Sequence, residues 1–222
     1  MGKTLVISFL ILGVLGLFGA KKTIMVVPED AKIFVNGMEV GSGTYTVNFD
    51  RNTEFVNLRF EAPGYITRKV KLLKNNPQKT VSYDLKEDAA YRASFGEEEG
   101  IDQANKWFTV NCKPGISEDM IWKRLTQITI DNFEQCEIRD KAAGWIKSGW
   151  VTTRFPEQTV RTQVEVRITF TDTETPSYKV RLTSEIKLNE CRSNQCWEKY
   201  PRLLKKFSEV VQEYQTSLGS NL

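Results

Sequence analysis

The side chains best suited to binding are basic residues on two neighbouring segments of the C-terminal half. Residues 160–170 and 178–186 alternate apolar and polar side chains, and this period of two predicts a pair of β-strands. The polar face of the pair carries Glu165 and four basic residues, Arg161, Arg167, Lys179 and Arg181. An uncovered sheet face with that bias would attract an anionic glycan or an acidic protein. The alternative is a solvated face whose charges form ordinary ion pairs.

Two tryptophans precede these strands in a segment that also contains basic residues. Residues 145–155 predict a further strand, interrupted by Gly149. Trp145 and Trp150 lie five residues apart, and an odd spacing on one strand places two side chains on opposite faces. We therefore expect one tryptophan in the core and the other exposed, where tryptophan is a common interface anchor.

The four cysteines predict two disulfides. Cys112, Cys136, Cys191 and Cys196 make an even number, which in an exported chain favours disulfide pairing. Cys191–Cys196 would close a small loop, and Cys112–Cys136 would join the two ends of a predicted helix, although two other connectivities exist. A metal site is disfavoured because the chain has no histidine and no C-x-x-C motif. No metal or cofactor is expected.

The absence of histidine also limits catalysis. Ser-His-Asp and Cys-His mechanisms are excluded, because both need an imidazole base. A glycan-processing enzyme with two carboxylates, such as Glu165 and Glu185, remains an alternative. The net charge of +3 is small, and no clustered basic stripe indicates nucleic-acid binding.

The N-terminus indicates export. Lys3 is followed by an uncharged apolar run that ends before Lys21, the pattern of a secretory signal peptide. Residues 1–20 are then either a cleaved signal peptide or an uncleaved anchor, with membrane association possible through residues 4–20. Ala20 suits a cleavage site, whereas the bulky Phe18 does not. In either case the rest of the chain is expected in the periplasm or cell envelope.

Residues 21–87 predict an all-β sandwich. Short segments alternate apolar and polar residues, and turn signals recur every 8–12 residues. Asn36 and Gly37 form a strong signal for a two-residue hairpin, because both tolerate positive φ. The sequences PEDAK at 28–32, VNG at 35–37 and APGY at 62–65, with Gly41, resemble the PEGA domain over residues 22–86.

The PEGA resemblance implies a small β-sandwich of exported proteins that mediates surface or carbohydrate interactions without catalysis. Tyr45 and Tyr65 could then stack on a sugar, although packing at the core or its rim is the alternative for both. The chain departs from the family pattern after Gly41, where Ser42 replaces the usual proline.

Residues 88–105 predict a linker, with an acidic run at 97–99, and residues 106–222 predict an α+β domain. Ser117 is a suitable N-cap for a helix that ends near Phe133, four strands follow, and Pro201 would open a final helix. An antiparallel sheet with its helices on one face is expected. In topology this order resembles the helix-grip or BamC-like domains of envelope lipoproteins.

These patterns together predict a non-catalytic exported envelope protein that binds or scaffolds a partner. The partner would be an envelope protein or a cell-wall or surface polysaccharide, and not a nucleic acid. A carboxylate-dependent glycan-processing enzyme and an anchored structural subunit of an envelope assembly are the alternatives.

Overall fold

The computed structural model describes residues 20–96, 103–169 and 176–218, and strands predominate in it, with 48% of residues in strands and 19% in helices. By residue packing the chain forms two compact units, which divide between Lys86 and Glu87. Each unit encloses its own cluster of buried apolar side chains. The N-terminal segment up to residue 19 and the acidic run at 97–99 lie outside the described residues.

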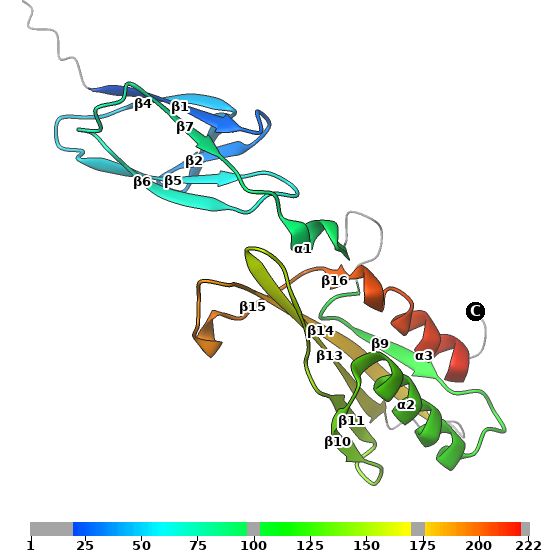
Figure 1. Ribbon diagram of the computed structural model, residues 1–222. Coiled ribbons are helices and arrows are strands. Elements are labelled where there is room, and N and C mark those ends of the chain that lie inside the picture. Colours follow the sequence, from blue (N-terminus) through cyan, green and yellow to red (C-terminus); the bar gives the residue numbers. More distant parts are fainter. Residues whose placement is uncertain (1–19, 97–102, 170–175, 219–222) are drawn as a thin grey trace, which may run out of the picture. The chain divides into compact units, whose positions relative to one another are not determined.

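The first unit consists of two sheets that face each other across one core (Figure 1). The sheet of order β4-β1-β7 contains Lys21–Val27 (β1), Thr44–Asn48 (β4) and Thr80–Asp84 (β7). The sheet of order β3-β2-β5-β6 contains Lys32–Val35 (β2), Met38–Ser42 (β3), Phe55–Glu61 (β5) and Arg68–Leu73 (β6). Alternate residues such as Val56, Leu58 and Phe60 are buried, so the strands predicted from the period of two are confirmed.

The hairpin between β2 and β3 has the geometry that its sequence predicts. Asn36 and Gly37 have φ values of 50° and 90°, as a type I′ turn requires. The Asn36 side chain also accepts a hydrogen bond of 3.0 Å from the Asn57 backbone N–H of β5. The turn therefore closes the hairpin and ties it to the neighbouring strand.

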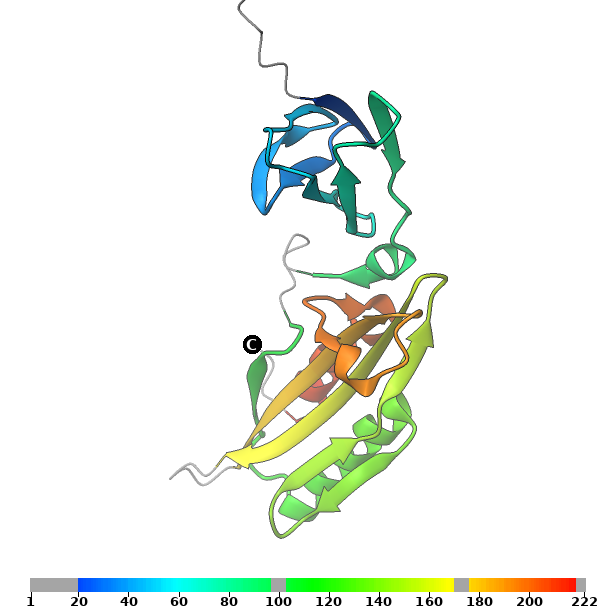
Figure 2. The same ribbon diagram turned by 90° about the vertical axis from the view of Figure 1, so that its left-hand side faces the viewer.

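The second unit is built on one antiparallel sheet around two long strands, Gln158–Thr169 (β13) and Ser177–Leu188 (β14), which pair over twelve residues. Cys136–Asp140 (β10), Trp145–Ser148 (β11) and Val151–Arg154 (β12) extend it beyond β13. Trp107–Asn111 (β9) and Glu198–Lys199 (β15) pair with β14. Helices α2 (Glu118–Phe133) and α3 (Val210–Leu218) cover one face (Figures 1 and 2). The antiparallel sheet with helices on one face agrees with the sequence-based expectation.

Helix α2 begins where the sequence predicts. The Ser117 hydroxyl accepts a hydrogen bond of 3.3 Å from the Met120 N–H, and Glu118 and Asp119 lie in the first turn, where their charge favours the helix dipole. Ile121, Leu125 and Phe133 are buried against the sheet.

Residues 88–96 are not the linker that the composition predicts. The Asp88 carboxylate caps the short helix α1 (Ala89–Arg92) by accepting from the Tyr91 N–H at 2.8 Å. The following strand β8 (Ser94–Phe95) pairs with β16 (Leu203–Leu204). Ala90 and Phe95 are buried in the second core, so this segment belongs to the second unit.

The C-terminal helix begins later than predicted. Leu203 and Leu204 form strand β16, and Lys205–Phe207 is a short 3₁₀ turn (η3). Helix α3 starts at Val210 rather than near Pro201. The apolar positions from Leu203 to Leu218 are nevertheless buried, because a short strand and a helix in succession cover the same core.

The structure contains one of the two predicted disulfides. Cys191–Cys196 is formed beside the 3₁₀ turn Asn194–Cys196 (η2), and it indicates an oxidising, exported environment. The predicted Cys112–Cys136 bond is wrong, because both side chains are free thiols. Cys136 lies in β10 and Cys112 directly follows β9, and three strands (β11, β13 and β14) lie between these two in the sheet. Four strand spacings amount to about 19 Å, whereas a disulfide needs Cα atoms within about 7 Å.

Among the described residues, no helix is both long and apolar enough to cross a membrane.

Candidate binding face

The four basic residues identified in the sequence all lie on one face of the second unit's sheet. Because β13 and β14 are paired residue by residue, alternate positions point to opposite sides. Val164, Val166 and Leu182 are buried on the side of the helices. The other side carries five basic and two acidic residues along these strands: Arg161, Arg167, Lys179, Arg181, Lys187, Glu165 and Glu185.

Glu165 is the centre of the ionic contacts on this face. One carboxylate oxygen binds Arg167 Nη2 at 2.6 Å and the other binds Arg181 Nη2 at 2.7 Å. Burial alone raises the pKa of Glu165, but the hydrogen bonds and charges of the two arginines outweigh it and lower the pKa. Although the side chain is only 8% exposed, the lowered pKa keeps this carboxylate ionised near neutral pH.

Each arginine of the face lies on at least one tryptophan ring. Arg167 lies 4.8 Å from the Trp145 ring centre, and Arg181 lies 4.4 Å from that of Trp107. Arg161 lies between Trp150 and Trp197, at 4.1 Å from each, and binds Glu185 at 2.6 Å. Cation–π contacts of this length stabilise both partners. We refer to these four tryptophans, with Arg161, Arg167, Arg181, Lys179, Lys187, Glu165 and Glu185, as the tryptophan–arginine face.

The expectation that Trp145 and Trp150 point to opposite sides is wrong. Trp145 lies opposite Arg167, and continuing this register would place Val151 opposite Arg161. Val151 instead lies opposite Thr162, so one extra residue is accommodated between β11 and β12. Such a bulge reverses the alternation, and both tryptophans reach the face that carries the arginines.

The face contains two further tryptophans, Trp107 and Trp197, that the sequence pattern does not indicate. Trp107 lies directly opposite Arg181 in the pairing of β9 with β14. Trp197 follows the Cys191–Cys196 loop and reaches Arg161. A strand beginning at Trp107 could be recognised from its alternation, whereas the position of Trp197 depends on the fold of the disulfide loop.

Lys179 is a basic residue of the face that makes no ion pair within the described residues. It is exposed and lies opposite Arg167 on the adjacent strand. Like charges in directly opposed positions destabilise a sheet, so a bound anion would relieve this pair.

The two tyrosines for which the PEGA resemblance predicts sugar stacking lie in the first unit. Tyr45 and Tyr65 are half-buried and pack against its apolar core. Their rings therefore offer less surface to a ligand than free tyrosines would.

The described part of the chain contains no group of three or more histidine, cysteine, aspartate or glutamate side chains that could hold a metal ion.

No model of a protein family matches the chain, and no curated protein matches it significantly in sequence. The resemblances to the PEGA domain and to helix-grip or BamC-like domains therefore stay predictions.

Proposed function

We propose that this chain is an exported, non-catalytic binding protein of the cell envelope, and that its tryptophan–arginine face holds an acidic partner. Its two packing units would act as two domains, of which the first is PEGA-like. The observation that carries the proposal is the excess of basic over acidic side chains along β13 and β14. A face with this bias attracts anions over a distance comparable with the Debye length.

The arginines of the face are held in place before any ligand arrives. Arg161, Arg167 and Arg181 each make an ion pair and a ring contact. Fixed side chains lose little conformational entropy when a ligand binds. The guanidinium edges that these contacts leave open can still donate to carboxylate or phosphate oxygens.

The two-carboxylate enzyme receives little support from the positions of Glu165 and Glu185. Each carboxylate is bound by arginine. The pKa of Glu165 is lowered, whereas a general acid needs a raised one. A binding role accounts better for these ion pairs.

The test measures the affinity of the purified full chain for polygalacturonate, an acidic polysaccharide, and for polyglutamate, a polypeptide that serves as a model of an acidic protein. Neutral dextran is the reference polymer. Lys179→Glu combined with Lys187→Glu changes the charge of the face without removing a partner of Glu165. We expect about tenfold weaker binding to the acidic partner. Lys123→Glu with Lys205→Glu makes the same change of charge away from the face, and it should bind as the wild type does.

The proposal fails if both double variants bind equally well, or if the wild type binds neither acidic polymer more tightly than dextran. Preference for polygalacturonate would identify a polysaccharide partner, and preference for polyglutamate an acidic protein.

A further inference from the structure

We infer that the first unit has a separate binding site for an acidic polysaccharide, on the outer face of β2, β5 and β6. This site goes beyond the tryptophan–arginine face, because it lies in the other packing unit and shares no residue with it. The inference depends only on the shape, the charge and the hydrogen-bonding groups of the first unit.

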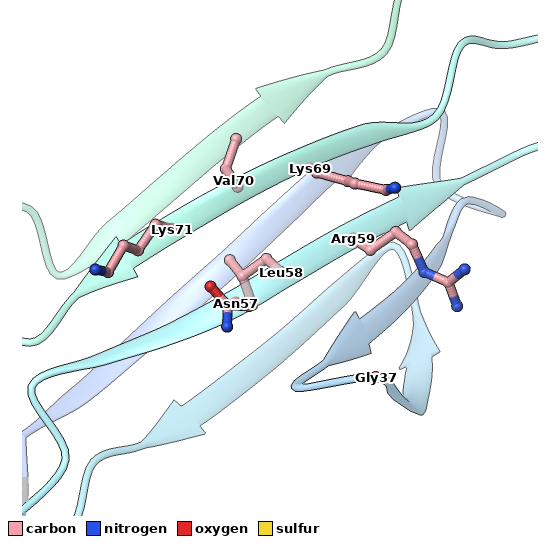
Figure 3. A pocket seen from close by; sticks show the side chains of 7 residues that line it. All are labelled: Gly37, Asn57, Leu58, Arg59, Lys69, Val70 and Lys71. Atoms are coloured by element: carbon pink, nitrogen blue, oxygen red, sulfur yellow. The ribbon is translucent and has the colours of Figure 1, made fainter. Parts of the chain in front are cut away.

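The site is a shallow depression of about 370 Å³ beside the Asn36–Gly37 hairpin. Figure 3 shows its lining, in which Asn57 and Arg59 come from β5 and Lys69 and Lys71 from β6. These four residues occupy outward positions of their strands, since the intervening Leu58 and Val70 point to the core, where Leu58 is buried and Val70 is partly buried.

The depression concentrates positive charge that acidic neighbours neutralise only in part. Arg59 lies directly opposite Lys69 on the neighbouring strand, an arrangement of like charges that destabilises a sheet. Glu61 binds Arg59 at 2.8 Å. Within the described residues neither Lys69 nor Lys71 has an acidic partner. An anion bound on the outer face, over Arg59 and Lys69, would offset the repulsion between these two side chains.

Two of the cations rest on aromatic rings of the same face. Arg59 lies 4.0 Å from the Phe34 ring centre, and Lys71 lies 3.5 Å from that of Phe55. The rings hold the charged groups near the surface, so less side-chain freedom is lost on binding.

Asn57 adds a neutral hydrogen-bonding group between the cations. Its backbone N–H is engaged by the Asn36 side chain, but its own side-chain amide has no partner among the described residues. An amide can both donate to and accept from a hydroxyl group. A ligand that carries hydroxyl groups as well as negative charge can therefore use Asn57 and the lysines together.

These features favour a polysaccharide over a protein. Lysine is depleted from the centres of protein–protein interfaces, yet lysines line this depression. Lys69 and Lys71 are two residues apart on one strand, about 7 Å, so a linear polymer with repeated acidic groups can meet both.

The test uses the full chain with hexagalacturonate, a six-residue oligosaccharide with repeated carboxylates, and measures affinity and stoichiometry by titration calorimetry at low ionic strength. We expect two sites on the wild type. Lys69→Glu with Lys71→Glu should weaken one site about tenfold or more. Lys21→Glu with Lys79→Glu, the same change of charge elsewhere in the first unit, should retain it. Circular dichroism of each variant verifies that the strands are formed.

Comparing the Lys69→Glu, Lys71→Glu variant with the Lys179→Glu, Lys187→Glu variant distinguishes this site from the tryptophan–arginine face. If Lys69→Glu with Lys71→Glu abolishes one site and Lys179→Glu with Lys187→Glu does not affect that site, the inference holds whether or not the other face binds. Unchanged stoichiometry and affinity in the folded Lys69→Glu and Lys71→Glu variant overturn it. Equal binding of hexaglutamate at this site also overturns it, because a purely ionic contact would then suffice.

Discussion

Glu165 connects two arginines that the sequence separates by fourteen residues, and its ionisation should therefore affect stability. Because its folded pKa is lowered, its contribution is present above the unfolded value of about 4.3 and is lost as the pH falls through the folded value. Glu165→Gln should cost about 1–3 kcal/mol at pH 7. Thermal unfolding measured from pH 7 to pH 3 should show the difference between wild type and variant shrinking towards the acid end. A constant difference would contradict the ionic role.

The cysteines allow a second prediction at the residue scale. Burial raises the pKa of the Cys112 thiol to about 11, and it also raises the pKa of Cys136, so little reactive thiolate is present at pH 8. Native protein should react slowly with iodoacetamide, whereas the unfolded, unreduced protein should take up two alkyl groups. Peptide mass mapping should find both on Cys112 and Cys136. Uptake of none would show that a second disulfide exists.

The elements show which parts of the fold follow from local sequence. The period of two predicts the strands of both units, and Ser117 predicts the start of α2, because these signals need only neighbouring residues. The bulge before Val151 and the pairing of β8 with β16 were missed, since both depend on partners far along the chain. The alternation of the two strands predicts that Arg161, Arg167, Lys179 and Arg181 share one face. Which tryptophans contact these arginines depends on the strand pairing, which the sequence alone does not give.

The segment from Asp88 to Phe95 illustrates this dependence on distant partners. Buried Arg202 donates to the Ser94 hydroxyl at 3.0 Å and to the Ser94 carbonyl at 3.1 Å. The Ser94 hydroxyl also lies 2.9 Å from that of Tyr200. No local sequence pattern around Ser94 predicts this buried hydrogen-bond network. The polar composition of the neighbouring residues predicts a linker instead.

At the scale of the whole molecule, each packing unit has its own core, and we expect the two to unfold separately. Gly43 tests the first unit. Its φ of +64° disfavours a side chain, and an added Cβ would lie 2.4 Å from the Glu29 carbonyl oxygen. Gly43→Ala should therefore cost about 2 kcal/mol or more. Gly37→Ala, also at positive φ but without a neighbour within 4 Å, is the milder control.

Arg202 tests the second unit, because Arg202→Ala removes the buried guanidinium that donates to the Ser94 hydroxyl and to the Ser94 carbonyl, at a cost of about 2–4 kcal/mol. Scanning calorimetry of the full chain should show two transitions. Gly43→Ala should lower the midpoint of one and Arg202→Ala that of the other, since neither change touches the other unit's core. If each substitution shifts a single common transition, the two units unfold cooperatively. The proposed binding sites would then have to be tested as parts of one domain, because damage to either unit would weaken both.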